Sequence, residues 1–376
     1  MIPCYRRYLP LSIFLLLATP LLAGFIVPES AQAILKENRT RTPAPSLPRT
    51  MREFAAWPKQ ADDYLGDRFG LRTQMIRLHA NLAKRWLGEG NDLVIVGRHG
   101  RLFFVGDVSV QQSAGLVRRD AQVTETADFL ATVREALSQR GARLLVASPP
   151  NTATIYQDDL PPWARNNGRT TEYTILLADL AARGIKAIDL RPVVWAARSK
   201  GPTYFYYDTH WTPRGAIAGF NAIAEADGHP EWRIDAATAL APGTHPGGDL
   251  AGMIGVGDDV SEPFEQLALP PAVFQPGSRV DLTGGPFPAF VTTSDRPGET
   301  VMIIGDSFTL GYFAPMLAKN VGRIIWQHHK WCGFDWKLID RFQPDEVWWM
   351  PTERYLLCSP NVRPDGFPSA QQTATH

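Results

Sequence analysis

The chain has 376 residues, of which 44% are hydrophobic and 20% charged, a composition typical of a globular protein with a sizeable core. Its 38 basic residues balance its 38 acidic residues, which excludes the strongly basic surface that nucleic acid attracts, so we expect no nucleic-acid partner. Neither the three cysteines nor the eight histidines show the spacing of a metal or redox site. We therefore expect no metal and no cofactor.

Residues 1–33 are predicted to be a signal peptide or a membrane anchor. Arg6 and Arg7 precede an uncharged apolar run over residues 8–27, and small residues follow it as far as Ala33. A cleaved signal peptide has this pattern, but a run of about 20 residues can also span a bilayer. Because the positive charges precede the run, both alternatives place the rest of the chain outside the cytoplasm.

The next segments predict a linker, two helices and two short strands. Residues 34–52 are rich in Pro, Thr and Arg and predict an extended linker. Apolar residues at steps of three and four over residues 54–87 predict two helices, separated at Gly70. Apolar runs at residues 92–97 and 102–105 predict strands with a turn between them.

From residue 124 onward, helices and strands alternate. The predicted helices span residues 124–140, 172–183 and 213–226, and the predicted strands span residues 143–147, 185–189, 301–304 and 345–350. Continuous apolar strands between amphipathic helices indicate an α/β fold, in which helices flank a parallel sheet on both faces. We predict one domain over residues 53–365, with an irregular insertion at 228–298 that is rich in Gly and Pro, and a disordered tail at 366–376.

Two motifs carry the chemistry of a serine nucleophile. Ser307 follows a predicted strand directly, at the edge of the sheet where ligands bind in open α/β folds. Taken alone it fits a helix cap equally well. Asp208 and His210 lie two residues apart, so on an extended segment their side chains project to the same side. They can supply the base and its orienting carboxylate, and we predict a catalytic triad of Ser307, His210 and Asp208.

Other residues are weaker candidates. We predict contacts with substrate for Trp211, Asn151, Gly248, Tyr312 and Arg354. Asn151 and the segment around Gly248 could also assist an oxyanion hole, whereas Glu353 and Arg354 fit either a substrate clamp or a plain salt bridge. Cys332 and Cys358 lie in the exported part, where a disulfide can persist, but their spacing leaves open whether they pair.

The order of these motifs resembles that of the alginate O-acetyltransferase family, the AlgJ/AlgX-like group of SGNH hydrolase-like proteins. The segment Asp208-Thr-His210-Trp-Thr precedes a strand followed by Gly305-Asp-Ser-Phe. Further similar segments lie at residues 37–39, 63–72, 94–104, 248–250 and 353–354. The resemblance implies a circularly permuted SGNH fold, because the Asp and His precede the Ser.

The resemblance also implies periplasmic O-acetylation of an alginate-like exopolysaccharide through an acetyl-enzyme. A membrane-bound O-acyltransferase would supply the acetyl group, and the N-terminal segment would hold the chain at the inner membrane if it is retained. A Pro-x-Lys of the family reads Pro149-Pro150-Asn151 here, and the chain ends soon after Arg354, as expected for the single-domain AlgJ-like form. Two alternatives remain open, namely a polysaccharide acetylesterase and a non-catalytic polysaccharide-binding component of an export complex.

Overall fold

The structure, a computed structural model, describes residues 14–15, 18–19, 42–67, 93–269, 279–281, 289–294, 298–330 and 332–358. The chain forms two compact units: unit 1 comprises Met1–Val96 and Pro246–Ser261, and unit 2 comprises Gly97–His245 and Glu262–His376. Most of the predicted signal or anchor segment, the predicted helix after Gly70 and the predicted tail lie outside the described residues. Within the described ranges, no helix has both the length and the apolar character needed to cross a bilayer.

Unit 1 contains the first of the two predicted N-terminal helices. Helix α3 spans Met51–Asp67, and its first turn is stabilised by Glu53, whose carboxylate accepts a hydrogen bond from the Arg49 backbone N–H. The unit also contains strand β1 (Val94–Val96) and the short helix α12 (Asp249–Met253). The two predicted strands are therefore present, since β2 (Leu102–Phe104) follows β1 after the turn at Arg98–Gly100.

Unit 2 is built on a seven-stranded sheet with the strand order β4-β3-β11-β9-β10-β8-β7. Its strands are β3 (Arg143–Val146), β4 (Lys186–Ala187), β7 (Arg279–Asp281), β8 (Ala289–Thr293), β9 (Thr300–Gly305), β10 (Arg323–His328) and β11 (Glu346–Met350). The five strands from β4 to β10 are parallel, as predicted.

The expectation of a wholly parallel sheet is wrong at one edge. Strands β8 and β7 are antiparallel to their neighbours, so the sheet is mixed. Only residues 294–299 connect β8 to β9, and a parallel connection needs a crossover of a dozen or more residues. The short connection therefore forces β8 to run opposite to the central strands.

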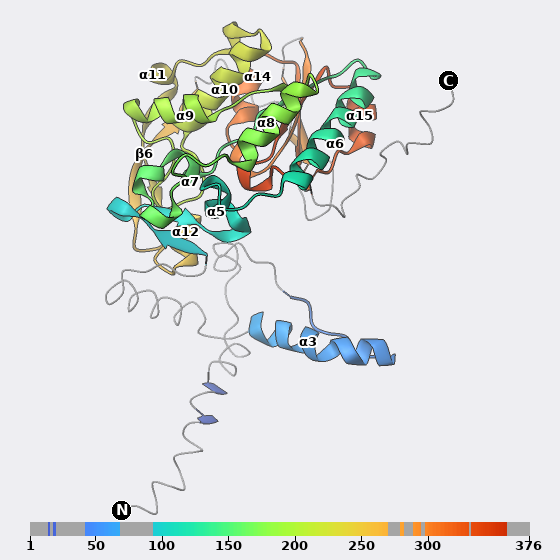
Figure 1. Ribbon diagram of the computed structural model, residues 1–376, viewed down its shortest axis with the longest axis vertical. Coiled ribbons are helices and arrows are strands. Elements are labelled where there is room, and N and C mark those ends of the chain that lie inside the picture. The colour runs from blue at the N-terminus through green and yellow to red at the C-terminus, as the bar shows by residue number, and fades with distance from the viewer. Residues whose placement is uncertain are drawn as a thin grey trace, which may run out of the picture. The chain divides into compact units, whose positions relative to one another are not determined.

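Helices cover both faces of the sheet, as the sequence predicts. The helices of unit 2 are α5 (Ser109–Ser113), α6 (Asp120–Ser138), α7 (Thr152–Ile155), α8 (Glu172–Ala182), α9 (Arg191–Ala197), α10 (Pro213–Asp227), α11 (Ala236–Ala239), α13 (Ser307–Leu310), α14 (Phe313–Ala318) and α15 (Trp336–Phe342). Helices α6, α8 and α15 share one apolar core with the sheet (Figure 1). On the other face, Phe220 of α10 and Phe313 of α14 pack against Trp348 of β11.

Residues 228–298, predicted to be irregular, contain regular elements. Besides α11, β7 and β8, they include strands β5 (Leu240–Pro246) and β6 (Ser261–Leu267), which pair in a two-stranded sheet. Most side chains of β5 are exposed or half-buried, so backbone pairing holds the strand without an alternating apolar pattern. The sequence therefore lacked the signal on which a strand prediction depends.

Cys332 and Cys358 form a disulfide, which answers the question that their spacing left open. Their Cα atoms are 5.2 Å apart, and both residues belong to or pack against the core that α6, α8 and α15 share with the sheet. The bond links the segment after β10 to the segment after β11, next to the part of the chain that carries Arg354.

Candidate active site

Ser307 lies where the central strand β9 ends. Strand β9 is buried between β11 and β10, and Ser307 is the first residue of α13. The buried Asp306 fixes this turn, because its carboxylate accepts hydrogen bonds from the backbone N–H of Phe308 (3.0 Å) and of Thr352 (2.7 Å). A Cβ at Gly305 would collide with the Thr309 hydroxyl, so only glycine fits there. The turn leaves the Ser307 side chain exposed.

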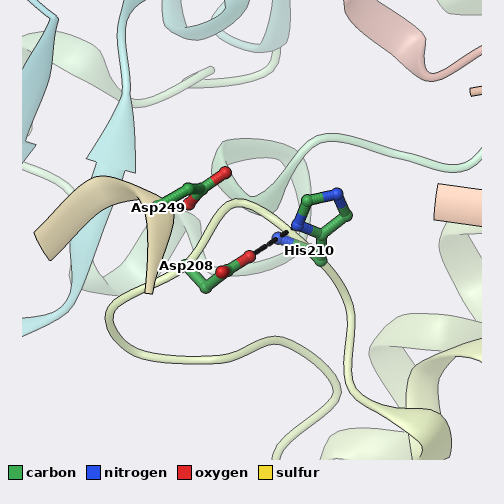
Figure 2. A group of neighbouring side chains, drawn as sticks. All are labelled: Asp208, His210 and Asp249. Atoms are coloured by element: carbon green, nitrogen blue, oxygen red, sulfur yellow. Dashed lines mark hydrogen bonds and ion pairs between the residues drawn. The ribbon is translucent and has the colours of Figure 1, made fainter. Parts of the chain in front are cut away.

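The structure brings Ser307, His210 and Asp208 into one hydrogen-bonded chain. The Nε2 atom of His210 lies 2.7 Å from the Ser307 Oγ atom, and its Nδ1 atom lies 2.6 Å from Asp208 Oδ1. Figure 2 shows the Asp208 carboxylate and the His210 side chain joined by this interaction. The same carboxylate oxygen accepts the His210 backbone N–H at 2.9 Å. This geometry is that of a nucleophile, a base and its orienting carboxylate.

Asp208 is held in its ionised form. Its burial by itself would raise the pKa of the carboxyl group, but the interactions with His210 and His245 lower that pKa more strongly. The net result is a pKa well below the ordinary value of an aspartate. A carboxylate that stays charged can fix the His210 tautomer and stabilise the imidazolium.

A buried arginine holds the segment that leads to His210. Arg101 donates hydrogen bonds to the carbonyl oxygens of Tyr204 (3.3 Å) and Phe205 (2.9 Å), and its Nε atom lies 3.0 Å from Asp159. Its guanidinium lies between two aromatic rings, 3.7 Å from the centroid of Tyr156 and 3.9 Å from that of Tyr206. The aromatic run before Asp208 is therefore fixed by charge-assisted hydrogen bonds and by stacking.

A second charged residue completes this hold on the loop. Glu262 of β6 accepts the backbone N–H groups of Tyr206 (2.8 Å) and Tyr207 (3.1 Å). Burial raises the pKa of Glu262, while these two hydrogen bonds lower it. The roles of Arg101 and Glu262 could not be predicted from the sequence, because neither lies near Asp208 in the chain, although Arg101 falls within the family-like segment 94–104.

Trp211 is part of the scaffold, and its burial gives no support to the predicted contact with substrate. The side chain is fully buried, so it cannot stack on a sugar ring. Its indole N–H donates to the Phe308 carbonyl oxygen at 2.9 Å, and its ring stacks on Phe313 at 5.7 Å. Trp211 thus ties the segment that carries His210 to the helix that carries Ser307.

Asn151 and Gly248 gain no support as substrate contacts. Asn151 is buried, and its amide nitrogen donates to the Ser113 hydroxyl (3.2 Å) and the Ser109 carbonyl oxygen (3.4 Å). Its backbone N–H donates to the Glu353 carboxylate at 2.8 Å. Gly248 precedes α12 and belongs to unit 1, whereas the triad belongs to unit 2. Its position in unit 1 therefore does not support a contact with substrate.

Tyr312 and Arg354 lie close to the triad. Burial, followed by the charge of Asp208, raises the pKa of Tyr312 to about 12, so its hydroxyl stays protonated. The Arg354 guanidinium lies 5.2 Å from the Phe308 ring centroid. Glu353 is fully buried and accepts hydrogen bonds from Thr154 and Asn151, so it has a role separate from that of Arg354. Substrate contact by Tyr312 and Arg354 stays a prediction.

Residues 94–349 match the family described as SGNH hydrolase-like domain, acetyltransferase AlgX, and this match covers more than half of the chain. The chain belongs to this family. Its fold is therefore SGNH hydrolase-like.

Curated relatives match over a shorter stretch. A protein of Pseudomonas syringae pv. tomato named "Probable alginate O-acetylase AlgJ" is 25% identical over 193 residues, which cover 50% of this chain and 48% of that protein. A protein of Azotobacter vinelandii with the same name is 26% identical over 214 residues, 56% of this chain and 53% of that protein. This chain spans about half the length of the curated relatives it matches.

Among solved structures, the O-acetyltransferase domain of Pseudomonas putida AlgJ is 20% identical with a TM-score of 0.47. That comparison covers 73% of this chain and 96% of that domain.

His245 is a further residue of the site in this chain, and it could not be identified from the sequence. Its Nε2 atom lies 3.6 Å from Asp208 Oδ2, an ion-pair distance, and its ring stacks on Phe205 at 4.2 Å. The interaction with Asp208 raises the pKa of His245, although burial opposes this. The histidine lies in a segment rich in Gly and Pro, where no motif or spacing marks it. Asp208 therefore has an imidazole on each side, His210 and His245.

Asp208 and His210 are also residue types that bind metal ions. In the described geometry, Asp208 and Ser307 engage the two ring nitrogens of His210. The arrangement is built for moving a proton between Ser307 and His210.

Proposed function

We propose that this protein is a periplasmic O-acetyltransferase that transfers acetyl groups to the hydroxyls of an alginate-like exopolysaccharide. The observation that carries the proposal is the hydrogen-bonded chain from Ser307 through His210 to Asp208, with distances of 2.7 and 2.6 Å, at the end of a central strand. Membership of the AlgX acetyltransferase family and the names of the AlgJ relatives support this activity over other serine chemistry.

In the first step, Ser307 takes the acetyl group from its donor. His210 accepts the Ser307 proton at Nε2 while Oγ attacks the carbonyl carbon, because these two atoms are already 2.7 Å apart. Asp208 fixes the tautomer with hydrogen on Nδ1 and stabilises the imidazolium that forms. The leaving group receives the proton from His210, and an acetyl-serine remains.

The backbone N–H of Ser307 is our candidate oxyanion donor. Within the described part of the chain, this N–H has no hydrogen-bond acceptor, whereas the N–H of Phe308 is already bonded to Asp306. A free donor beside the nucleophile can stabilise the negative charge that develops on the carbonyl oxygen. This refines the sequence-based expectation that N–H groups near Ser307 form the oxyanion hole.

In the second step, a sugar hydroxyl takes the acetyl group. His210 removes the proton of the hydroxyl, whose oxygen attacks the acetyl carbon, and Ser307 regains its proton. We propose that a membrane-bound O-acyltransferase supplies acetyl groups on the periplasmic side. The apolar run at residues 8–27 supports export, and it would keep the protein near that partner at the inner membrane if it is retained.

The test compares the wild-type protein with Ser307→Ala in an assay with an acetyl ester, with and without an oligosaccharide acceptor. We expect the variant to lose at least about a thousandfold in rate and to keep its fold, because the exposed hydroxyl makes no packing contribution. Ser138→Ala, at an exposed serine at the end of α6, is the matched control.

Full activity of Ser307→Ala would refute the assignment of the nucleophile. Hydrolysis by the wild-type protein at a rate that the acceptor leaves unchanged, with no acetylated sugar formed, would identify an acetylesterase instead. Acetylated oligosaccharide, formed only with intact Ser307, supports the transferase.

A further inference from the structure

A surface pocket lies beyond the carboxyl ends of β3 and β4. Helix α7 follows β3, helix α9 follows β4, and residues of both helices line a pocket of about 740 Å³. The lining residues are Thr154, Ile155, Gln157, Asp158, Trp195, Ala196, Arg198 and Ser199. None of them belongs to the triad or to the residues that hold it.

The wall of this pocket contains an exposed tryptophan. Trp195 of α9 is 61% exposed, although most large apolar side chains of unit 2 are buried. A tryptophan ring left in water offers a flat apolar platform that the apolar face of a sugar ring can cover. Trp163 is 62% exposed but does not line the pocket.

Polar groups beside Trp195 are arranged to bind hydroxyls. Arg198 and Asp158 form a bidentate pair at 2.8 and 3.0 Å, and the Asp158 side chain stays largely exposed. The hydrogen bond from Arg198 lowers the pKa of Asp158 below its usual value, so a charged acceptor faces the pocket. Gln157 uses its amide oxygen to accept the Asn166 N–H, and within the described residues its amide nitrogen has no partner.

These groups are held in place before any ligand binds. The Arg198 guanidinium also donates to the Ile155 carbonyl oxygen at 2.8 Å and lies 4.2 Å from the Tyr156 ring centroid. An apolar platform flanked by fixed donors and acceptors matches the chemistry of a pyranose, which has an apolar face and a rim of hydroxyls. Because the charges of Asp158 and Arg198 nearly cancel, the pocket can bind neutral sugars as well as acidic ones.

The pocket lies at the same edge of the sheet as Ser307. Strand β3 is separated from β9 only by β11, and β4 is the next strand outward. Neighbouring strands are about 4.8 Å apart, so β3 and β4 lie about 10 to 14 Å from the strand that presents Ser307. Thr154 of the pocket wall donates to Glu353, which follows β11. A polymer bound at Ser307 could therefore reach this pocket with a neighbouring part of its chain.

We propose that the pocket around Trp195 is a distal acceptor subsite, which binds a sugar residue of the polysaccharide a few residues away from the one being acetylated. The role as an acceptor subsite depends on the transferase function proposed above, but the binding of sugar does not. The subsite would favour long chains over short ones, because only a long chain can occupy it and the triad together.

The test measures binding and transfer separately. In the Ser307→Ala background, binding of an oligomannuronate octamer and of cello-octaose is measured by calorimetry, with and without Trp195→Ala. We expect Trp195→Ala to weaken the binding of at least one octamer about tenfold, while Trp163→Ala, the matched control, leaves it unchanged. With Ser307 present, Trp195→Ala should raise the KM for that octamer about tenfold and change kcat less than twofold.

The two octamers distinguish an acidic from a neutral acceptor. The proposed subsite would be overturned if Trp195→Ala left the affinity for both octamers unchanged. It would also be overturned if Trp163→Ala lowered the affinity as much as Trp195→Ala does. Octamer binding that depends on Trp195 in a protein that proves unable to transfer acetyl groups would uphold the sugar pocket and refute the transferase. Circular dichroism checks that each variant is folded.

Discussion

Ser307 and His210, the proposed nucleophile and base, are held in different ways. Ser307 follows β9, which is hydrogen-bonded to parallel strands on both sides, so the backbone of the sheet fixes its position. His210 lies in a loop that no long strand supports. The loop depends on Arg101 and Glu262, which come from remote segments, and on its own Trp211, which donates to the Phe308 carbonyl oxygen.

This difference predicts where the site is sensitive. Substitutions that keep the sheet intact should leave Ser307 in place, whereas loss of one polar side chain can move His210. A shift of about 1 Å in a reacting group can cost roughly a hundredfold in rate. The position of His210, and with it the reaction rate, should therefore respond to substitutions of residues that do not contact substrate.

The largest effect is expected for Asp208→Asn. The amide cannot stabilise the imidazolium, and it favours the wrong tautomer of His210, so kcat should fall by about ten-thousandfold. This fall is checked by measuring the rate of acetyl-enzyme formation in reactions that are stopped at set times. Asp120→Asn, at an exposed ion pair with Arg118, is the matched control and should have no effect on kcat. A loss below about tenfold at Asp208 would show that His210 does not need its carboxylate.

A smaller effect is expected for Arg101→Met, which tests whether side chains hold the loop. Methionine fills much of the volume but leaves Asp159 and the carbonyl oxygens of Tyr204 and Phe205 without their donor. The free energy of unfolding should fall by about 3 kcal/mol, and activity should fall in the variant that is still folded. Urea unfolding and kcat measure the two effects.

Arg118→Met removes an exposed ion pair and should cost less than about 1 kcal/mol in the same urea experiment. If Arg101→Met were no more destabilising than this control, the loop would have another support.

The smallest effect is expected for His245→Gln. Because its interaction with Asp208 raises the pKa of His245 in the folded protein, this pair stabilises the protein below the unfolded-state pKa of about 6.5. The contribution disappears as the pH rises through the folded-state pKa. The variant should thus be less stable than the wild type at pH 5.5, by less than about 1 kcal/mol, and the difference should shrink by pH 8.5. A difference that grows with pH would contradict the pairing.

The elements with strong local patterns could be predicted from the sequence. The predicted helix at residues 172–183 is α8 (Glu172–Ala182), and the predicted strand at 301–304 lies within β9. Their apolar side chains follow a regular pattern because these side chains are buried in the folded protein. The pairing of Asp208 with His210 could also be predicted, because the two residues lie only two positions apart. The reason differs from the predicted extended segment, since residues 206–210 form a bend in which the His210 backbone N–H donates to the Asp208 carboxylate.

Other features could not be predicted because they join distant parts of the chain. Trp211 was predicted to contact substrate, but its burial against Phe313 and its hydrogen bond to Phe308 are visible only in the folded protein. The direction of β8 depended on a short connection whose ends could not be placed from sequence. His245 shows no signal, because it acts through a residue 37 positions earlier.

The sequence by itself thus indicated the residues of the proposed triad and the strand that precedes Ser307, because both depend on short-range patterns. Only the tertiary structure decided that Ser307 and His210 meet at 2.7 Å across 97 positions, and that His245 joins Asp208. It also placed the Trp195 pocket at the same edge of the sheet. The physical reason is that these distances depend on the parallel order of the strands and on buried side chains, which bring remote segments together.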